Sequence, residues 1–158
     1  IGSRVATIGH AFGMKVLAYD PYAKSMPALC ERAETLTGLL SRSDVISLHC
    51  PLTDENRGMI NSEALAHCKR NAILVNTARG GLIHSESLLA ALRDGTLHSA
   101  ALDSFTQEPL TAPHLWQSVE NVVISPHIGG VTDASYIKMG TVAAGNILAV
   151  TDATTVSS

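Results

Sequence analysis

Several features are scarce in this sequence, and each scarcity excludes a class of protein. The 158 residues include three cysteines, Cys30, Cys50 and Cys68, and no two of them form a CxxC pair. An odd number of scattered thiols argues against a disulfide framework and fits a reducing compartment, so we expect a cytoplasmic protein. No apolar run approaches the roughly 18 residues of a membrane span, and no basic-then-apolar leader segment occurs. We therefore expect a soluble protein with no membrane partner.

Positive charge is also scarce. The 11 lysines and arginines are scattered and are outnumbered by 14 acidic residues, which gives a formal net charge of −3. Proteins that bind a phosphate backbone usually carry a clustered excess of basic side chains, so we expect no nucleic acid partner. Apolar residues, in contrast, make up 46% of the chain. That fraction is enough for one sizeable core, and we expect one domain.

Helical and extended patterns alternate along the chain. Residues 1, 5, 8 and 12 are apolar at helical spacing, and Gly13 suits the left-handed position that ends a helix. The further patterns predict helices at 36–43, 62–69, 85–94 and 133–150. Asn61 or Ser62 would cap the helix at 62–69, Ser85 would cap the helix at 85–94, and Gly95 would end that helix. Strands are predicted at 15–20, 44–49, 72–76, 99–103 and 121–125. Such alternation is typical of an α/β fold, a doubly wound parallel sheet with helices on both faces.

Polar residues and glycines follow the predicted strands. Asp20, the His49-Cys50-Pro51 turn, residues 77–81, Asp103 with Glu108, and His127 each come after a different strand. Ligands of open α/β sheets bind outside the carboxyl ends of the strands. We therefore expect folding to gather these residues on one rim of the sheet.

Three of these side chains supply complementary chemistry. The guanidinium of Arg79, the carboxylate of Glu108 and the imidazole of His127 are what a reversible hydride transfer between a ketone and an alcohol needs from a protein. Two of them, Arg79 and His127, have an ordinary alternative when they are considered alone. Arg79 could be a surface arginine beside a Gly-Gly turn, and most histidines are surface or satisfied core residues.

Two His-Cys pairs, at 49–50 and 67–68, do not predict a metal centre. Adjacent side chains point apart, and the chain has no four-ligand spacing. We expect no metal.

Together these segments resemble the NAD-binding domain of the D-isomer-specific 2-hydroxyacid dehydrogenases, the family that includes phosphoglycerate dehydrogenase and hydroxypyruvate/glyoxylate reductase. The resemblance covers nearly the whole chain and rests on motifs at 13–21, 43–53, 76–81, 101–110 and 125–130. It implies a Rossmann-type sheet, NAD as the cofactor, and hydride transfer between NAD(H) and a D-2-hydroxyacid or 2-oxoacid such as 3-phosphoglycerate, glyoxylate or hydroxypyruvate. It also implies a homodimer for the full-length protein.

The resemblance implies roles for individual residues. Arg79 would hold the substrate carboxylate and polarise the reacting carbonyl, His127 would exchange the hydroxyl proton, and Glu108 would hold His127. Asp20 would bind the adenosine ribose and repel the 2′-phosphate of NADP; otherwise it is a turn residue. Asp103 would bind the nicotinamide carboxamide with the Thr77 backbone, or else cap a strand end. The implied cofactor-binding residues are Ile1, Gly2, Asp20, Cys50, Pro51, Thr77, Ala78, Arg79, Asp103, His127, Gly129 and Gly130.

Some family features are expected but do not occur in the sequence. Gly2 matches the third glycine of the dinucleotide fingerprint, whereas the first strand, the first two glycines and the substrate domain have no counterpart. We therefore expect an N-terminally truncated domain at 1–150, a C-terminal tail at 151–158, and a sheet incompletely paired between the strands ending at Asp20 and His49. The identity of the 2-hydroxyacid stays open.

Two alternatives also stay open. One is an NAD-sensing, corepressor-like protein of the same fold, in which binding of NAD governs association rather than turnover. The other is a formate dehydrogenase, which resembles this fold but has glutamine in place of the glutamate. Glu108 argues against the second.

Overall fold

The computed structural model describes residues 1–155. The chain consists of two compact units, Ile1–His127 and Ile128–Ser158. The first unit contains the elements α1 (Gly2–Ala11), β1 (Val16–Ala18), β2 (Cys30–Arg32), α2 (Leu36–Arg42), β3 (Val45–Leu48), α3 (Ser62–Ala66), β4 (Ile73–Asn76), the 3-10 helix η1 (Gly80–Leu82), α4 (Ser85–Arg93), β5 (Ser99–Leu102) and β6 (Val122–Ile124). The second contains α5 (Asp133–Thr155).

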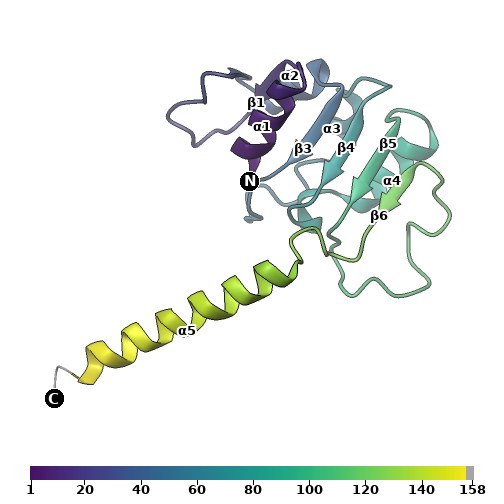
Figure 1. The fold of residues 1–158 in the computed structure, drawn as a ribbon. Helices are drawn as coiled ribbons and strands as arrows, with labels where there is room; N and C mark the ends of the chain where they lie inside the picture. The colour runs from purple at the N-terminus through teal and green to yellow at the C-terminus, as the bar shows by residue number, and fades with distance from the viewer. Residues whose placement is uncertain (156–158) are drawn as a thin grey trace. The chain divides into compact units, whose positions relative to one another are not determined.

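The strands of the first unit pair in parallel, which confirms the predicted α/β class. Strands β3, β4, β5 and β6 form a four-stranded sheet in that order (Figure 1). Leu48, Asn76 and Leu102 lie side by side at the ends of β3, β4 and β5. Because these strands end at one level, the turns that follow them lie on one rim of the sheet.

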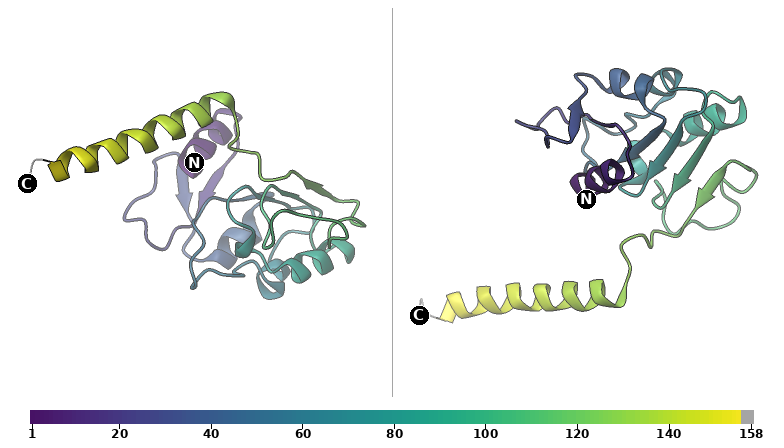
Figure 2. Two further views of the ribbon diagram at one scale, coloured as in Figure 1. Left: turned by 90° about the horizontal axis from the view of Figure 1, so that it is seen from below. Right: turned by 45° about the horizontal axis from the view of Figure 1, so that its top comes forward.

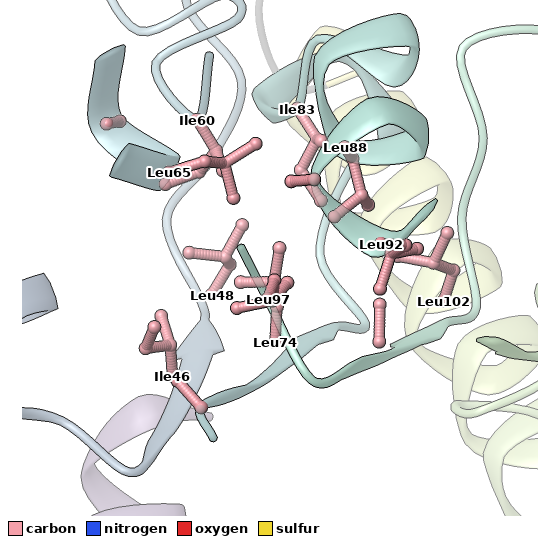
Figure 3. Packing of buried hydrophobic residues seen from close by; sticks show 14 of the residues in the cluster. Ile46, Leu48, Ile60, Leu65, Leu74, Ile83, Leu88, Leu92, Leu97 and Leu102 are labelled. Carbon is pink, nitrogen blue, oxygen red and sulfur yellow. The ribbon is translucent and has the colours of Figure 1, made fainter. Parts of the chain in front are cut away.

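The core lies on one face of this sheet. Buried and more exposed residues alternate along β3, β4 and β5, as expected for strands with one covered face. Figure 3 shows the buried side chains of these strands, Leu74 and Leu102 among them, facing Leu65 of α3 and Leu88 of α4. On the other face Val45 is 52% exposed and Ile73 is 37% exposed. This face is therefore less covered than the core face among the described residues, and the predicted α/β class is unaffected.

The strands β1 and β2 form a separate two-stranded sheet. Helix α1 lies beside β1 (Figures 1 and 2). Among the described residues, no ladder joins β1 to β3, so each of these strands has one unpaired edge. This confirms the expected incomplete pairing between the strands that precede Asp20 and His49.

Most of the local signals act as expected. Gly13 and Gly95 have left-handed φ angles of 79° and 74° after α1 and α4, and Asn61 caps α3 by accepting a 2.9 Å hydrogen bond from Ala64 N–H. The prediction of Ser85 as a cap was wrong. His84 is the N-cap of α4 and Ser85 is its first helical residue, because the extended backbone persists to His84.

The second unit is dominated by α5. Thr132 and Ser135 form a reciprocal cap at its start, with each hydroxyl accepting from the other residue's N–H at 3.0 Å and 2.9 Å. The helix extends past the predicted end at residue 150 to Thr155, and residues 156–158 of the expected tail lie outside the described residues. None of the helices in the described part is long and apolar enough to cross a bilayer.

Candidate active site

The turn after β4 presents Arg79 to solvent. Thr77 and Arg79 are exposed, whereas Asn76 before them is buried. The Arg79 guanidinium donates a 2.8 Å hydrogen bond to the carbonyl of Ala78, and no carboxylate among residues 1–151 forms an ion pair with it. A guanidinium with unused donors at a strand end is suited to bind a carboxylate ligand.

Glu108 holds His127 at the same rim. Its Oε2 lies 2.8 Å from Nδ1 of His127, and its Oε1 accepts a 2.8 Å hydrogen bond from Phe105 N–H. The Phe105 N–H, followed by the bond to His127, lowers the pKa of the Glu108 carboxyl, which is therefore ionised at neutral pH. The contact through Nδ1 leaves Nε2 of the ring available to a ligand.

The backbone of His127 has an unusual conformation. Its φ angle is 57°, in the left-handed region that side chains other than glycine seldom occupy. Pro126 precedes it, and His127 N–H donates a 3.0 Å bond to Ser125 O. Such backbone strain clusters at functional sites because the surrounding structure must maintain it.

Asp103 is buried at the end of β5 and is joined to the end of β6. The hydroxyl of Ser125 donates a 2.6 Å hydrogen bond to Asp103 Oδ1. Reasoning from the sequence missed Ser125, although it stands two residues before His127 in the quoted motif. This bond connects Asp103 to the segment that carries His127.

The Arg79 turn packs directly on the segment that leads to Glu108. A Cβ atom at Gly80 would lie 2.1 Å from the carbonyl carbon of Phe105, so glycine permits the two backbones to touch. The structure thus places the Arg79 turn and the Glu108–His127 pair on neighbouring segments of the first unit.

A second group of candidates gathers beside α1. A Cβ atom at Gly2 would lie 3.2 Å from Cβ of His49, so the start of α1 touches the turn after β3. Burial lowers the pKa of His49 and raises that of the Cys50 thiol, and the Asp20 carboxylate adds to the rise at Cys50. Gly2, Asp20 and Cys50 therefore lie in one region.

Asp20 is also part of a turn. Its Oδ1 accepts hydrogen bonds from Tyr22 N–H at 2.9 Å and Ala23 N–H at 3.2 Å. The Tyr22 hydroxyl donates a 2.5 Å bond to Glu55, which links the loop after β1 to the loop after β3. Asp20 therefore stabilises this turn through Oδ1, and its role toward a cofactor stays a prediction.

The remaining predicted residues differ in their placement. Ile1 is 90% exposed and Pro51 is exposed, both in the first unit. Gly129 and Gly130 belong to the second unit. Among the described residues, no group of three or more His, Cys, Asp or Glu side chains is arranged to hold a metal ion.

Known proteins match this chain over almost its whole length. The model of the family described as D-isomer specific 2-hydroxyacid dehydrogenase, NAD binding domain, matches residues 1–129. A glyoxylate reductase of Aeropyrum pernix is 42% identical over 151 residues, which are 94% of this chain and 45% of the relative. A hydroxypyruvate reductase of Thermotoga maritima is 44% identical over 142 residues, which are 89% of this chain and 46% of the relative.

A solved structure agrees with the fold. The D-lactate dehydrogenase from Aquifex aeolicus, complexed with NAD and lactic acid, has a TM-score of 0.85 and 35% identity, over 97% of this chain and 51% of that chain. The likeness identifies the parallel α/β arrangement as Rossmann-like. The chain spans about half the length of these matched proteins.

Proposed function

This chain belongs to the D-isomer specific 2-hydroxyacid dehydrogenases, whose NAD-binding domain it matches over residues 1–129, and we propose that the protein containing it transfers a hydride between NAD(H) and a D-2-hydroxyacid or its 2-oxoacid. One observation carries the proposal most directly. Glu108 holds His127 through Nδ1 at 2.8 Å on the segment that packs against the Arg79 turn. The packing of these two segments supports a site in which His127 is the proton donor and the Arg79 guanidinium binds the substrate carboxylate.

The residues beside α1 fit an adenine dinucleotide. Gly2 allows close approach at the start of α1, and anionic groups are favoured at a helix N-terminus. Asp20 would accept hydrogen bonds from the adenosine ribose, Cys50 and Pro51 would line the adenine side, and Asp103 with Thr77 would orient the nicotinamide carboxamide. Ile1, Ala78, Gly129 and Gly130 complete the proposed contacts.

Each proposed catalytic residue performs one task. NAD(H) supplies or accepts the hydride when it is bound. Arg79 binds the substrate carboxylate and polarises the adjacent carbonyl, which fixes the reacting carbon in the site. His127 gives a proton to the carbonyl oxygen from Nε2 during reduction and takes it back during oxidation. Glu108 fixes the ring and stabilises its protonated form.

The names of the matched relatives suggest the substrate class. Glyoxylate and hydroxypyruvate are the 2-oxoacids of two of them, and a D-3-phosphoglycerate dehydrogenase of Methanocaldococcus jannaschii matches at 41% identity. The proposal covers this class of small 2-oxoacids. It further includes an NAD-binding domain at 1–150, a homodimer of the full-length protein and a cytoplasmic location, which the three free cysteines support.

The experiment measures NADH oxidation by the full-length protein with glyoxylate, hydroxypyruvate and 3-phosphohydroxypyruvate. We choose His127→Asn as the variant because asparagine tolerates a positive φ angle and so preserves the turn. Turnover should fall by about 10²-fold or more, since general acid–base catalysis contributes roughly 10²–10⁴, and NADH affinity should barely change. Near-normal turnover in the variant would contradict the role of His127. NADH binding without turnover in the unaltered protein would favour the NAD-sensing alternative.

A further inference from the structure

Asn76 is a polar side chain with no solvent exposure at the end of β4. It is 0% exposed and stands among the largest fully buried side chains of the first unit, where the others are leucine and isoleucine. Burying a carboxamide is costly unless its polar atoms form hydrogen bonds. The Oδ1 atom accepts a 3.0 Å bond from Ala78 N–H, and Nδ2 donates a 2.9 Å bond to Arg79 O. Both ends of the side chain are therefore bonded to the turn that follows it.

The backbone of Asn76 is itself fixed by the sheet. Asn76 pairs with Leu48 of β3 and Leu102 of β5, and its carbonyl accepts a 2.9 Å bond from Asp103 N–H. The hydrogen bonds of its side chain hold the backbone of the next three residues relative to the sheet. One carboxamide thus connects the rigid end of β4 to the backbone that carries Arg79.

The direction of the Arg79 side chain depends on this turn. Its guanidinium bonds to the carbonyl of Ala78, whose own N–H is the one held by Asn76. Within residues 1–151, whose side chains the structure describes, no carboxylate forms an ion pair with the guanidinium to fix its direction from elsewhere. The turn conformation therefore determines where the guanidinium points.

We propose that Asn76 is a positioning residue for substrate binding, because it holds the turn that directs the Arg79 guanidinium toward the carboxylate of the 2-oxoacid. This inference rests on the function proposed above. An asparagine that only stabilised the fold would change the free energy of unfolding without a selective effect on the affinity for the oxoacid. The two roles are therefore separable by experiment.

Asn76→Asp gives the sharpest test, because it preserves the shape of the side chain. A neutral carboxylic acid can accept from Ala78 N–H and donate to Arg79 O, as the carboxamide does. An ionised carboxylate can only accept, so one of its oxygens would face the carbonyl of Arg79 and the turn would open. At high pH the KM for the oxoacid should be about tenfold higher than in the unaltered protein. This is the change expected when one hydrogen bond of about 1.4 kcal/mol is lost. The KM should return toward the unaltered value as the pH falls and the carboxyl is protonated.

A second readout does not depend on turnover. In Asn76→Leu the Ala78 N–H loses its acceptor, so its hydrogen exchange should become about tenfold faster or more, while exchange at Leu74 in the middle of β4 stays slow. Leu74→Val is the matched control, because it loosens the core on the same strand without touching the turn. It should lower stability and leave both the oxoacid KM and the exchange at Ala78 unchanged.

The outcomes separate the two proposals. An Asn76→Asp variant with an unchanged oxoacid KM across the pH range, or an Asn76→Leu variant with unchanged exchange at Ala78, would overturn the role of Asn76. The role would also be overturned if Leu74→Val weakened the affinity for the oxoacid as much as the Asn76 variants do at the same loss of stability. If the unaltered protein reduced no 2-oxoacid, the proposed function would fail, and exchange at Ala78 would still decide whether Asn76 holds the turn.

Discussion

Glu108 has a different partner at each of its carboxylate oxygens, so a single side chain affects two parts of the site. Oε1 fixes the backbone of Phe105, which packs on Gly80 beside Arg79, and Oε2 contacts His127. These two bonds lower the pKa of Glu108, so the carboxylate is ionised at neutral pH. The stabilisation that the ionised form gains from them is lost as the pH falls through the lowered pKa, below the ordinary value of 4.5.

We predict that Glu108→Gln shifts the pH dependence of oxoacid reduction to lower pH. Glutamine can still accept from Phe105 N–H, but it has no negative charge to stabilise a protonated imidazole. Turnover in the reduction direction should fall by about tenfold at high pH, a part of the roughly 10²–10⁴ of acid–base catalysis, and should approach that of the unaltered protein at low pH. Initial rates of NADH oxidation across the pH range measure the shift.

Glu86→Gln is the matched control for this prediction. Glu86 lies 3.7 Å from Nε2 of His84 on the exposed start of α4, so it forms a carboxylate–histidine pair of residues that have no proposed role in the site. Its removal should leave the pH profile in place. A profile that is unshifted in Glu108→Gln, or shifted equally in both variants, would contradict the pairing of Glu108 with His127 as a catalytic feature.

We predict that Asp20 makes NAD the preferred cofactor over NADP by at least about tenfold. A hydrogen bond from the ribose to the charged Asp20 carboxylate contributes about 1.5–3 kcal/mol, and about 1.4 kcal/mol corresponds to a factor of ten in affinity. Asp20→Asn should narrow this preference, because it removes the charge that repels the 2′-phosphate. It retains the acceptor for Tyr22 N–H and Ala23 N–H. The ratio of kcat/KM for NADH and NADPH measures the preference.

Asp44→Asn serves as the control for Asp20. Asp44 is an exposed carboxylate before the start of β3, paired with Lys69 at 2.8 Å, and so lies at the opposite end of the strand from the site. The cofactor ratio should not respond to this change. Equal use of NADPH by the unaltered protein would show that Asp20 does not select the cofactor.

The positions of the principal candidates could be predicted from the sequence, but the residues that support them could not. Arg79, Glu108 and His127 each follow a recognisable strand, so their common rim follows from the parallel sheet. Asn76 and Ser125 act through hydrogen bonds to a turn and to a neighbouring strand. A buried asparagine and a short serine give no periodic signal, and only the folded geometry reveals these partners.

At the level of elements, strong periodic patterns predicted most helices and strands to within a few residues. The strand β2 was missed because its three residues, Cys30-Glu31-Arg32, combine one half-buried and two exposed positions and so lack a core pattern. The 3-10 helix at Gly80–Leu82 was missed as well. It forms because the turn must bring Gly80 against the Phe105 backbone, a long-range requirement that is absent from the local sequence.

We predict that Gly80→Ala disrupts the contact between these two segments. The added Cβ would lie 2.1 Å from the carbonyl carbon and 2.4 Å from the Cα of Phe105, so a backbone segment must move. Overpacking of this kind typically costs about 1–3 kcal/mol of stability. Turnover should fall as well, because the displaced Phe105 N–H no longer holds Glu108. Denaturant unfolding and NADH oxidation assays measure the two effects.

Gly81→Ala is the neighbouring control. Its Cβ would approach Cδ2 of Leu52 at 2.7 Å, and that side-chain end can rotate away. The loss of stability should therefore be smaller than in Gly80→Ala. If both variants behaved alike, or if Gly80→Ala were as stable and active as the unaltered protein, the backbone contact would not organise the site.

For the first unit as a whole, two separate sheets that each end in an unpaired strand imply incomplete main-chain hydrogen bonding. Both β1 and β3 have one free edge among the described residues. Helix α1 adds an exposed apolar stripe formed by Ile1, Val5, Ile8 and Phe12. Open strand edges and exposed apolar stripes promote association with other chains.

We therefore predict that the 158-residue polypeptide, studied by itself, binds NADH poorly, shows no dehydrogenase activity and tends to aggregate. The cofactor candidates Gly2, Asp20 and Cys50 come from three segments around these open edges, and incompletely paired segments cannot hold a preorganised site. A fluorescence titration with NADH and size-exclusion chromatography measure the outcome. Micromolar binding by a monodisperse, cooperatively unfolding sample would show that β1, β3 and α1 form a competent cofactor site without a further strand between the two sheets.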